Sequence, residues 1–170
     1  HPRDRRQRQM CIRDSFKRKA TLKDEDGNLF KDNDERAIFF AKGVIETVKK
    51  LNWAPDIIHV HGWLASLLPL YLKKYYKDEP LFKESKVVTS IYDQSFEGSL
   101  DCTLIDKIKF DEIEDGFLQN LETPNYVNLL KTAIDFSDGL IKGSQTLPEE
   151  LNTYIKNCLL YTSPSPRDVP

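Results

Sequence analysis

The stretch from Trp53 to Trp63, WAPDIIHVHGW, decides the fold of this chain. Pro55 breaks any helix that precedes it, and the β-branched run from Pro55 to Val60 is typical of a short buried strand. An apolar segment with helical spacing, Trp63 to Tyr76, begins directly after this run. A strand followed at once by a helix is the first half of a βαβ unit.

A second strand is predicted at Lys86 to Tyr92 (KVVTSIY). Because both predicted strands are nearly all apolar, they suit a parallel sheet that is covered on both faces. Pro69 lies inside the intervening helix, where it lacks an N–H donor and crowds the carbonyl of Ala65. We therefore expect this helix to be kinked or to begin late.

The flanking segments extend the same pattern. An amphipathic helix is expected over residues 34–51, with Asp32 or Asn33 as its N-cap, because a short side-chain oxygen can accept a free N–H of the first turn. Residues 93–124 are charged and weakly periodic, which indicates an irregular excursion with one short helix. Further elements are expected as helix 126–136, strand 139–142 and helix 148–156. The alternation predicts an α/β fold with a doubly wound, mostly parallel sheet.

Composition excludes several classes of protein. The 170 residues carry 25 Lys and Arg against 27 Asp and Glu, a formal charge of −2, with no internal basic cluster of the kind that binds nucleic acid. The longest apolar stretch, Trp63 to Leu72, has ten residues and contains a proline, whereas a membrane-spanning helix needs about 20. We expect neither a nucleic-acid partner nor a membrane partner, and a cytoplasmic location.

Both ends of the sequence resemble translated sequencing-adapter DNA. The sequence ATGTGTATAAGAGACAG encodes Met10 to Asp14, and its reverse complement, read one base in, encodes Cys158 to Thr162. Residues 1–15 and 158–170 are therefore predicted to be non-native, and residues 16–157 to be the middle of a longer protein. Removing six basic and three acidic residues leaves 25 − 6 = 19 against 27 − 3 = 24, a charge of −5. Cys102 is then the one remaining cysteine, which is compatible with a reducing compartment.

Ligands of such sheets bind beyond the C-terminal ends of the strands, so residues 59–63, 92–98 and 143–145 are expected to line one cleft. His59 and His61 would face the same way on a strand, but no third ligand has the spacing of a metal site, and no metal is predicted. We expect His59 to be a core histidine. His61 lies at the strand exit, where a structural and a ligand-binding role are equally supported. Neither a dinucleotide fingerprint nor a P-loop is present, so no cofactor is expected.

The order and spacing of these motifs resemble the N-terminal domain of bacterial glycogen/starch synthases. The resemblance covers about residues 30–155. Its motifs are D-N-x-x-R from Asp32, W-x-P-D-I-I-H-x-H-x-W from Trp53, L-x-P-L-Y-L from Leu67, K-V-V-T-S-I with the following F-x-G from Lys86 to Gly98, and K-x-A-I-D-F-S-D-G-L-I from Lys131. This resemblance implies one Rossmann-like half of a two-domain retaining glycosyltransferase, which moves glucose from ADP-glucose to an α-1,4-glucan.

The resemblance also implies roles for individual residues. His61 would contact the transferred glucose near its reacting carbon, and Asp32 would contact sugar hydroxyls. Arg36 also matches, either as a ligand contact or as a brace for the carboxylates around it. The remaining positions implied in substrate binding are Asn33, Tyr92, Asp93 and Gly98.

Several residues depart from the family pattern. Gly62 replaces the aspartate that follows the second histidine, Tyr92 and Asp93 replace a His-Asn pair, and Glu97 replaces a glutamine.

The expected partners are ADP-glucose and an α-1,4-glucan, which this domain would bind jointly with a C-terminal domain. The isolated piece is therefore expected to be inactive. A non-catalytic glucan-binding or regulatory module is the alternative, and a different Rossmann-type sugar transferase is a further one.

Overall fold

A parallel sheet forms the centre of the molecule. The computed structural model describes residues 20–158 and 162–164. Its strands are β1 (Ile57–His61), β2 (Lys86–Ile91), β3 (Gly139–Lys142) and β4 (Thr162–Pro164), paired in this order and all in parallel. The predicted parallel α/β fold is thus confirmed.

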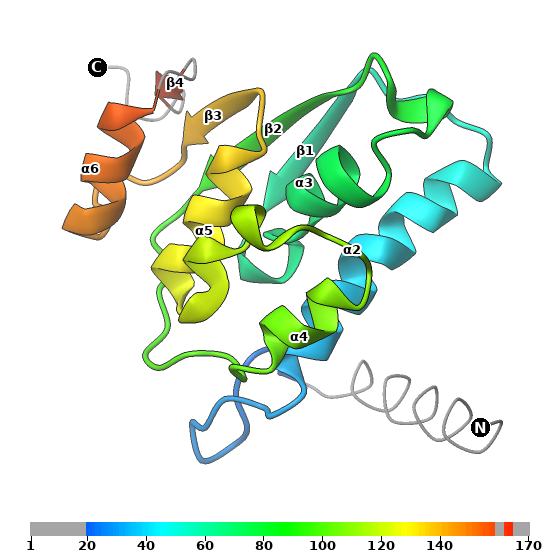
Figure 1. The fold of residues 1–170 in the computed structure, drawn as a ribbon. Coiled ribbons are helices and arrows are strands. Elements are labelled where there is room, and N and C mark those ends of the chain that lie inside the picture. The colour runs from blue at the N-terminus through cyan, green and yellow to red at the C-terminus, as the bar shows by residue number, and fades with distance from the viewer. Residues whose placement is uncertain (1–19, 159–161, 165–170) are drawn as a thin grey trace, which may run out of the picture.

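The helices lie close to their expected positions (Figure 1). Helix α2 (Asn33–Lys50) precedes β1, and α5 (Tyr126–Asp135) and α6 (Glu149–Asn157) flank β3. The excursion between β2 and α5 contains the expected short helix, α4 (Leu104–Lys109), and also two 3₁₀ turns, Asp115–Phe117 and Gln119–Glu122.

The sequence predicts one helix after β1, either kinked or with a late start, and the structure divides this segment into three short pieces. These are a 3₁₀ turn (Trp63–Ala65), a short α3 (Leu68–Leu70) and a π-helical turn (Tyr71–Tyr75). Pro69 lies in the first turn of α3, where its missing N–H is not needed. The expected late start is therefore correct, and the proline is its physical cause.

Alternate residues of the strands lie in different environments. Val60, Val87 and Leu140 are buried beneath the helical layer, in which α3 packs against both α2 and α5. Ile57 and the two histidines of β1 point to the other face and are exposed. Within the described residues, the helices thus cover one face of the sheet. This is one of the two helical layers of a doubly wound fold.

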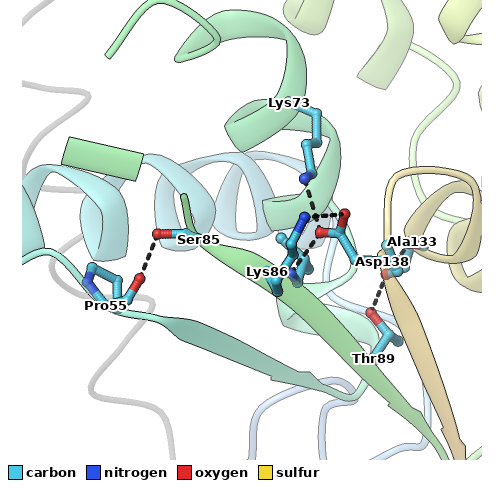
Figure 2. A network of polar contacts seen from close by, with 9 residues as sticks. Pro55, Lys73, Ser85, Lys86, Thr89, Ala133 and Asp138 are labelled. Carbon is cyan, nitrogen blue, oxygen red and sulfur yellow. Dashed lines mark hydrogen bonds and ion pairs between the residues drawn. The ribbon is translucent and has the colours of Figure 1, made fainter. Parts of the chain in front are cut away.

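Asp138 joins β2, β3 and the segment after β1 at the N-terminal end of the strands (Figure 2). Its Oδ2 accepts hydrogen bonds of 2.8 Å from the backbone N–H of Val87 and from Lys73 Nζ. Its own N–H donates to the Val87 carbonyl over 2.7 Å. Beside it, the hydroxyls of Thr89 and Ser137 lie 2.7 Å apart. The motif residues Ser137 and Asp138 therefore hold the sheet together.

Burial acts to raise the pKa of Asp138, but the bonds from Lys73 and Val87 outweigh it and lower that pKa below its ordinary value. A lowered folded-state pKa stabilises the fold at pH values above the unfolded pKa, and this contribution is lost as pH falls through the folded pKa. Asp138 therefore stabilises the fold at neutral pH.

Replacing Asp138 by alanine leaves the Val87 N–H without its acceptor, so we expect Asp138→Ala to lower the free energy of unfolding by about 1–3 kcal/mol at pH 7. Asp138→Asn keeps an acceptor oxygen, and its loss should be less than half as large. Urea unfolding of the full chain measures both variants. Equal losses at pH 7 would contradict the assigned role of the Val87 bond, and the difference from the unsubstituted chain should shrink at acidic pH.

Two sequence predictions concern the chain ends. Residues 1–15 lie outside the described residues, and the range 158–170 is described only in part. Within it, residues 162–164 form β4, which pairs with β3. The prediction that both ends are non-native stays a prediction.

Candidate functional site

Three strand ends meet at one edge of the sheet, as the topology predicts (Figure 1). The rings of His61, at the end of β1, and Tyr92, just after β2, are stacked with centroids 6.2 Å apart and an interplanar angle of 27°. The N–H of Asp93 donates to Ser144 Oγ, just beyond β3, over 2.9 Å. Tyr126, the first residue of α5, donates its hydroxyl to the Tyr92 carbonyl. His61, Tyr92 and Asp93 therefore lie together.

Glycines allow this close approach. Gly62 turns the chain out of β1 with φ 72° and ψ 172°, a backbone region that is essentially restricted to glycine. The ring of Tyr92 lies directly over Gly143, so that a Cβ added there would lie 2.4 Å from the ring. The φ of Gly143 is not in the left-handed region, so the ring alone demands a glycine at this position.

The two histidines of β1 differ from expectation in one respect. Their rings lie side by side with centroids 4.0 Å apart, as predicted for alternate strand residues. The prediction that His59 is a core histidine is wrong: it is exposed, because the described helices cover the other face of β1. Its Nε2 lies 2.8 Å from Ser90 Oγ. The loss of part of the water around its ring, and secondarily the charge of His61, lower the pKa of His59.

The start of α2 places the other predicted residues. Asp32 is the residue before the helix and is half-buried, but its side chain makes no capping bond to the first turn within the described residues. Asn33 is 1% exposed, and its amide is used internally: Nδ2 donates to the Leu22 carbonyl over 2.8 Å and Oδ1 accepts from Arg36 over 2.9 Å. Arg36 also donates to the Thr21 carbonyl. Asn33 and Arg36 thus brace the chain that leads into α2.

Gly98 lies against the same chain segment. Its φ is +88°, and a Cβ added to it would lie 3.4 Å from Cδ1 of Leu29. Leu29 pairs with Lys23 in the turn that precedes α2. The segment after β2 therefore contacts the segment that carries Asp32.

An ion pair that the sequence does not indicate lies in the first turn of α2, which directly follows Asp32. Lys107 of α4 donates to Oδ2 of the fully buried Asp34 over 2.5 Å and lies 3.1 Å from Glu35. Burial acts to lower the pKa of Lys107, but the hydrogen bonds to Asp34 and Glu35 outweigh it and raise that pKa. Lys107 and Asp34 are 73 positions apart in the sequence, and no local pattern indicates their contact.

Two further features bear on what the site can bind. Among the residues described, no three His, Cys, Asp or Glu side chains are grouped as a metal ion would require. An open hollow of about 480 Å³ lies on α5 and α6, lined by Lys131, Glu149, Glu150, Thr153, Tyr154 and Asn157. The groups at the strand ends are an imidazole, a phenol, carboxylates and exposed backbone, which are hydrogen-bonding groups suited to hydroxyls.

Comparison with known proteins identifies the family of the chain. Residues 9–160 match the starch synthase catalytic domain family. The chain is 38% identical over 125 residues to a glycogen synthase of Chlorobium luteolum, with 74% of this chain and 25% of that protein covered. It is 39% identical over 132 residues to one of Chlorobium phaeobacteroides (76% and 26% covered). For one of Clostridium perfringens, the identity is 32% over 125 residues (72% and 25% covered).

The chain therefore belongs to the starch synthase catalytic domain family, and it spans about a quarter of the length of these glycogen synthases. The family resemblance inferred from the motifs is confirmed. None of the helices in residues 20–158 combines the length and the apolar character needed to cross a membrane.

Substitution of Gly143 tests the packing of the strand ends. In Gly143→Ala the new methyl group must displace the ring of Tyr92, which should cost about 1–3 kcal/mol of stability and shift the ring resonances of His61 and Tyr92. Gly116→Ala is the matched control, because nothing lies within 4 Å of a Cβ at that glycine. NMR spectra and unfolding curves of the full chain provide the measurement. Unchanged resonances in Gly143→Ala would show that the ring does not lie over this glycine.

Proposed function

We propose that the full-length protein is a retaining hexosyltransferase that moves glucose from ADP-glucose to an α-1,4-glucan. The proposal is supported above all by the stacked pair of His61 and Tyr92 at the exits of β1 and β2, in a chain of the starch synthase catalytic domain family. The relatives that the chain matches are glycogen synthases.

His61 is proposed to contact the transferred glucose. It is exposed at the end of β1, and an imidazole there can donate or accept a hydrogen bond with a sugar hydroxyl. Asp32 is half-buried at the start of α2, where its carboxylate can accept from further hydroxyls. Fixed polar groups of this kind favour the positive charge that develops at the anomeric carbon in the transition state.

Tyr92, Asp93 and Gly98 are proposed to line the same site. Tyr92 is half-buried and presents its ring beside His61, while Asp93 and Gly98 are exposed. The family resemblance implies Asn33 as a substrate contact, and its burial and internal bonds support an indirect contribution through the backbone next to Asp32. The proposal includes no cofactor and no metal ion.

This chain is proposed to form one side of the cleft. It spans about a quarter of its relatives, and transfer needs donor and acceptor to be held together in one geometry. We therefore expect no transfer by this chain alone. A cytoplasmic location is part of the same proposal.

The second candidate function is a non-catalytic glucan-binding or regulatory module. Gly62 favours it, because it stands where the family carries an aspartate, and its backbone conformation suits glycine. Tyr92 and Asp93 in place of the His-Asn pair favour it too. Such a module would retain glycogen without incorporating glucose.

Substitution of His61 in the full-length protein tests the enzyme. We expect His61→Ala to lower kcat at least about 10²-fold with little change in stability, as when a transition-state contact is removed. His59→Ala is the matched control, because His59 lies on the same face of β1 and two residues before His61. Incorporation of labelled glucose from ADP-glucose into glycogen is measured.

The outcomes separate the candidates. Near-normal turnover by His61→Ala would contradict the role proposed for this imidazole. Glycogen retention without incorporation by the unsubstituted protein would favour the module, and use of another acceptor alone would favour a different sugar transferase.

A further inference from the structure

The proposed site is divided between two segments that are far apart in sequence. Asp32 lies at the start of α2, whereas Tyr92, Asp93 and Gly98 follow β2. A glucan held by both segments requires a fixed spacing between them, since a small misplacement of binding groups weakens binding and catalysis strongly. The inference about this spacing therefore rests on the proposed function, in which both segments contact the glucan.

Lys107 connects the first of these segments to α4, the helix that follows the second one. It is a residue of α4, in the excursion between β2 and α5, and it bonds to Asp34 and Glu35 in the first turn of α2. Asp34 is two residues from Asp32. The link therefore joins the middle of the excursion to the helix turn that directly follows Asp32, one of the proposed glucan contacts.

The supporting helix is firmly held. Leu104 and Ile108, on either side of Lys107, are both 0% exposed and belong to the hydrophobic core. Asp101 accepts the N–H of Thr103 over 2.9 Å just before α4 begins. The backbone at Lys107 is thus fixed relative to the core, so its ammonium group can fix the position of Asp34.

The burial of Asp34 costs free energy, which is unfavourable for a contact whose only role is to stabilise the fold. Asp34 is 0% exposed, its Oδ2 bonds Lys107, and its Oδ1 is buried with no hydrogen-bond partner within the described residues. Removing a carboxylate from water costs free energy that an ion pair offsets only in part, and apolar residues of similar volume often stabilise a fold as well or better. An ion pair, unlike an apolar contact, fixes the positions of two particular atoms relative to each other.

We propose that Lys107 is a positioning residue for glucan binding, which holds the first turn of α2, and with it Asp32, in a fixed place relative to the segment after β2. It does not contact the sugar. Its effect is transmitted through Asp34 and the backbone of the helix start.

The same helix supplies a matched control. Lys109 is two residues further along α4 and pairs with Asp115 over 3.1 Å. Both side chains of that pair are largely solvent-exposed, at 42% and 76%. An exposed pair contributes little, and Asp115 is not part of α2. Removing the charge at Lys109 therefore makes the same chemical change without touching the proposed link.

The test compares Lys107→Met, Lys107→Arg and Lys109→Met in the full-length protein. Methionine keeps the apolar stem and removes the charge, while arginine keeps the charge. In Lys107→Met we expect amide exchange in residues 33–36 and 98–103 to quicken together by at least about 10-fold. The KM for glycogen should rise at least about 10-fold and kcat at saturating glycogen should change less than about 3-fold. Arginine should restore both within about 3-fold, and Lys109→Met should change neither more than about 2-fold.

A contribution to stability alone would lower the melting temperature of Lys107→Met and leave the KM and both exchange rates unchanged below that temperature, which would overturn the proposal. If Lys107→Met does not fold, Asp34→Asn replaces it, because the amide oxygen still accepts from Lys107. This variant should quicken exchange in both segments by at least about 3-fold, and unchanged exchange in either segment would overturn the proposal.

Failure of the proposed function gives a different result. If Asp32→Ala leaves the glycogen KM unchanged, Asp32 is not a glucan contact, and the exchange rates then decide on the link by themselves. Quickened exchange in both segments supports it, and unchanged exchange in either overturns it.

Discussion

The parallel register between β1 and β2 is the constraint on which the rest of the structure depends. Pairing of His61 with Ser90 places the end of β1 beside the residue that follows β2, so that the rings of His61 and Tyr92 stack. A shift of one residue would turn His61 toward the helices and bring Val60, which is buried, to the exposed face. The register therefore sets both the core and the chemistry of the strand ends.

Several motif residues outside the strand ends hold the fold around this sheet in place. Asp138 fixes the start of β2 through the backbone of that strand (Figure 2). Asn33 and Arg36 fix the turn that leads into α2. Tyr71, which is fully buried, donates its hydroxyl to Asp111 of the excursion, and Lys42 of α2 pairs with the same carboxylate over 2.6 Å. Matching a family motif thus indicates a shared fold at these positions, while the open strand ends carry the groups that can meet a ligand.

Local pattern was sufficient to predict the strands and most helices. The apolar runs around Ile58 and Val88 predict strands, and Pro69 predicts where a helix begins. Each of these predictions depends only on neighbouring residues, and the structure has the elements at these positions. The exposure of His59 could not be predicted in this way, because it depends on which face the helices cover. The link from Lys107 to Asp34 depends on chain folding over 73 positions, so no periodicity reveals it. The convergence of His61 and Tyr92, in contrast, follows from the rule that parallel strands end at one edge.

The central claim is that the imidazole at the end of β1 and the carboxylate before α2 serve one carbohydrate site. A crystal structure of the full-length protein with ADP and maltotriose tests it most directly. The account predicts sugar hydroxyls within hydrogen-bond distance of both His61 and Asp32. A maltotriose bound in the α5–α6 hollow beside Tyr154, with neither group in contact with sugar, would contradict it.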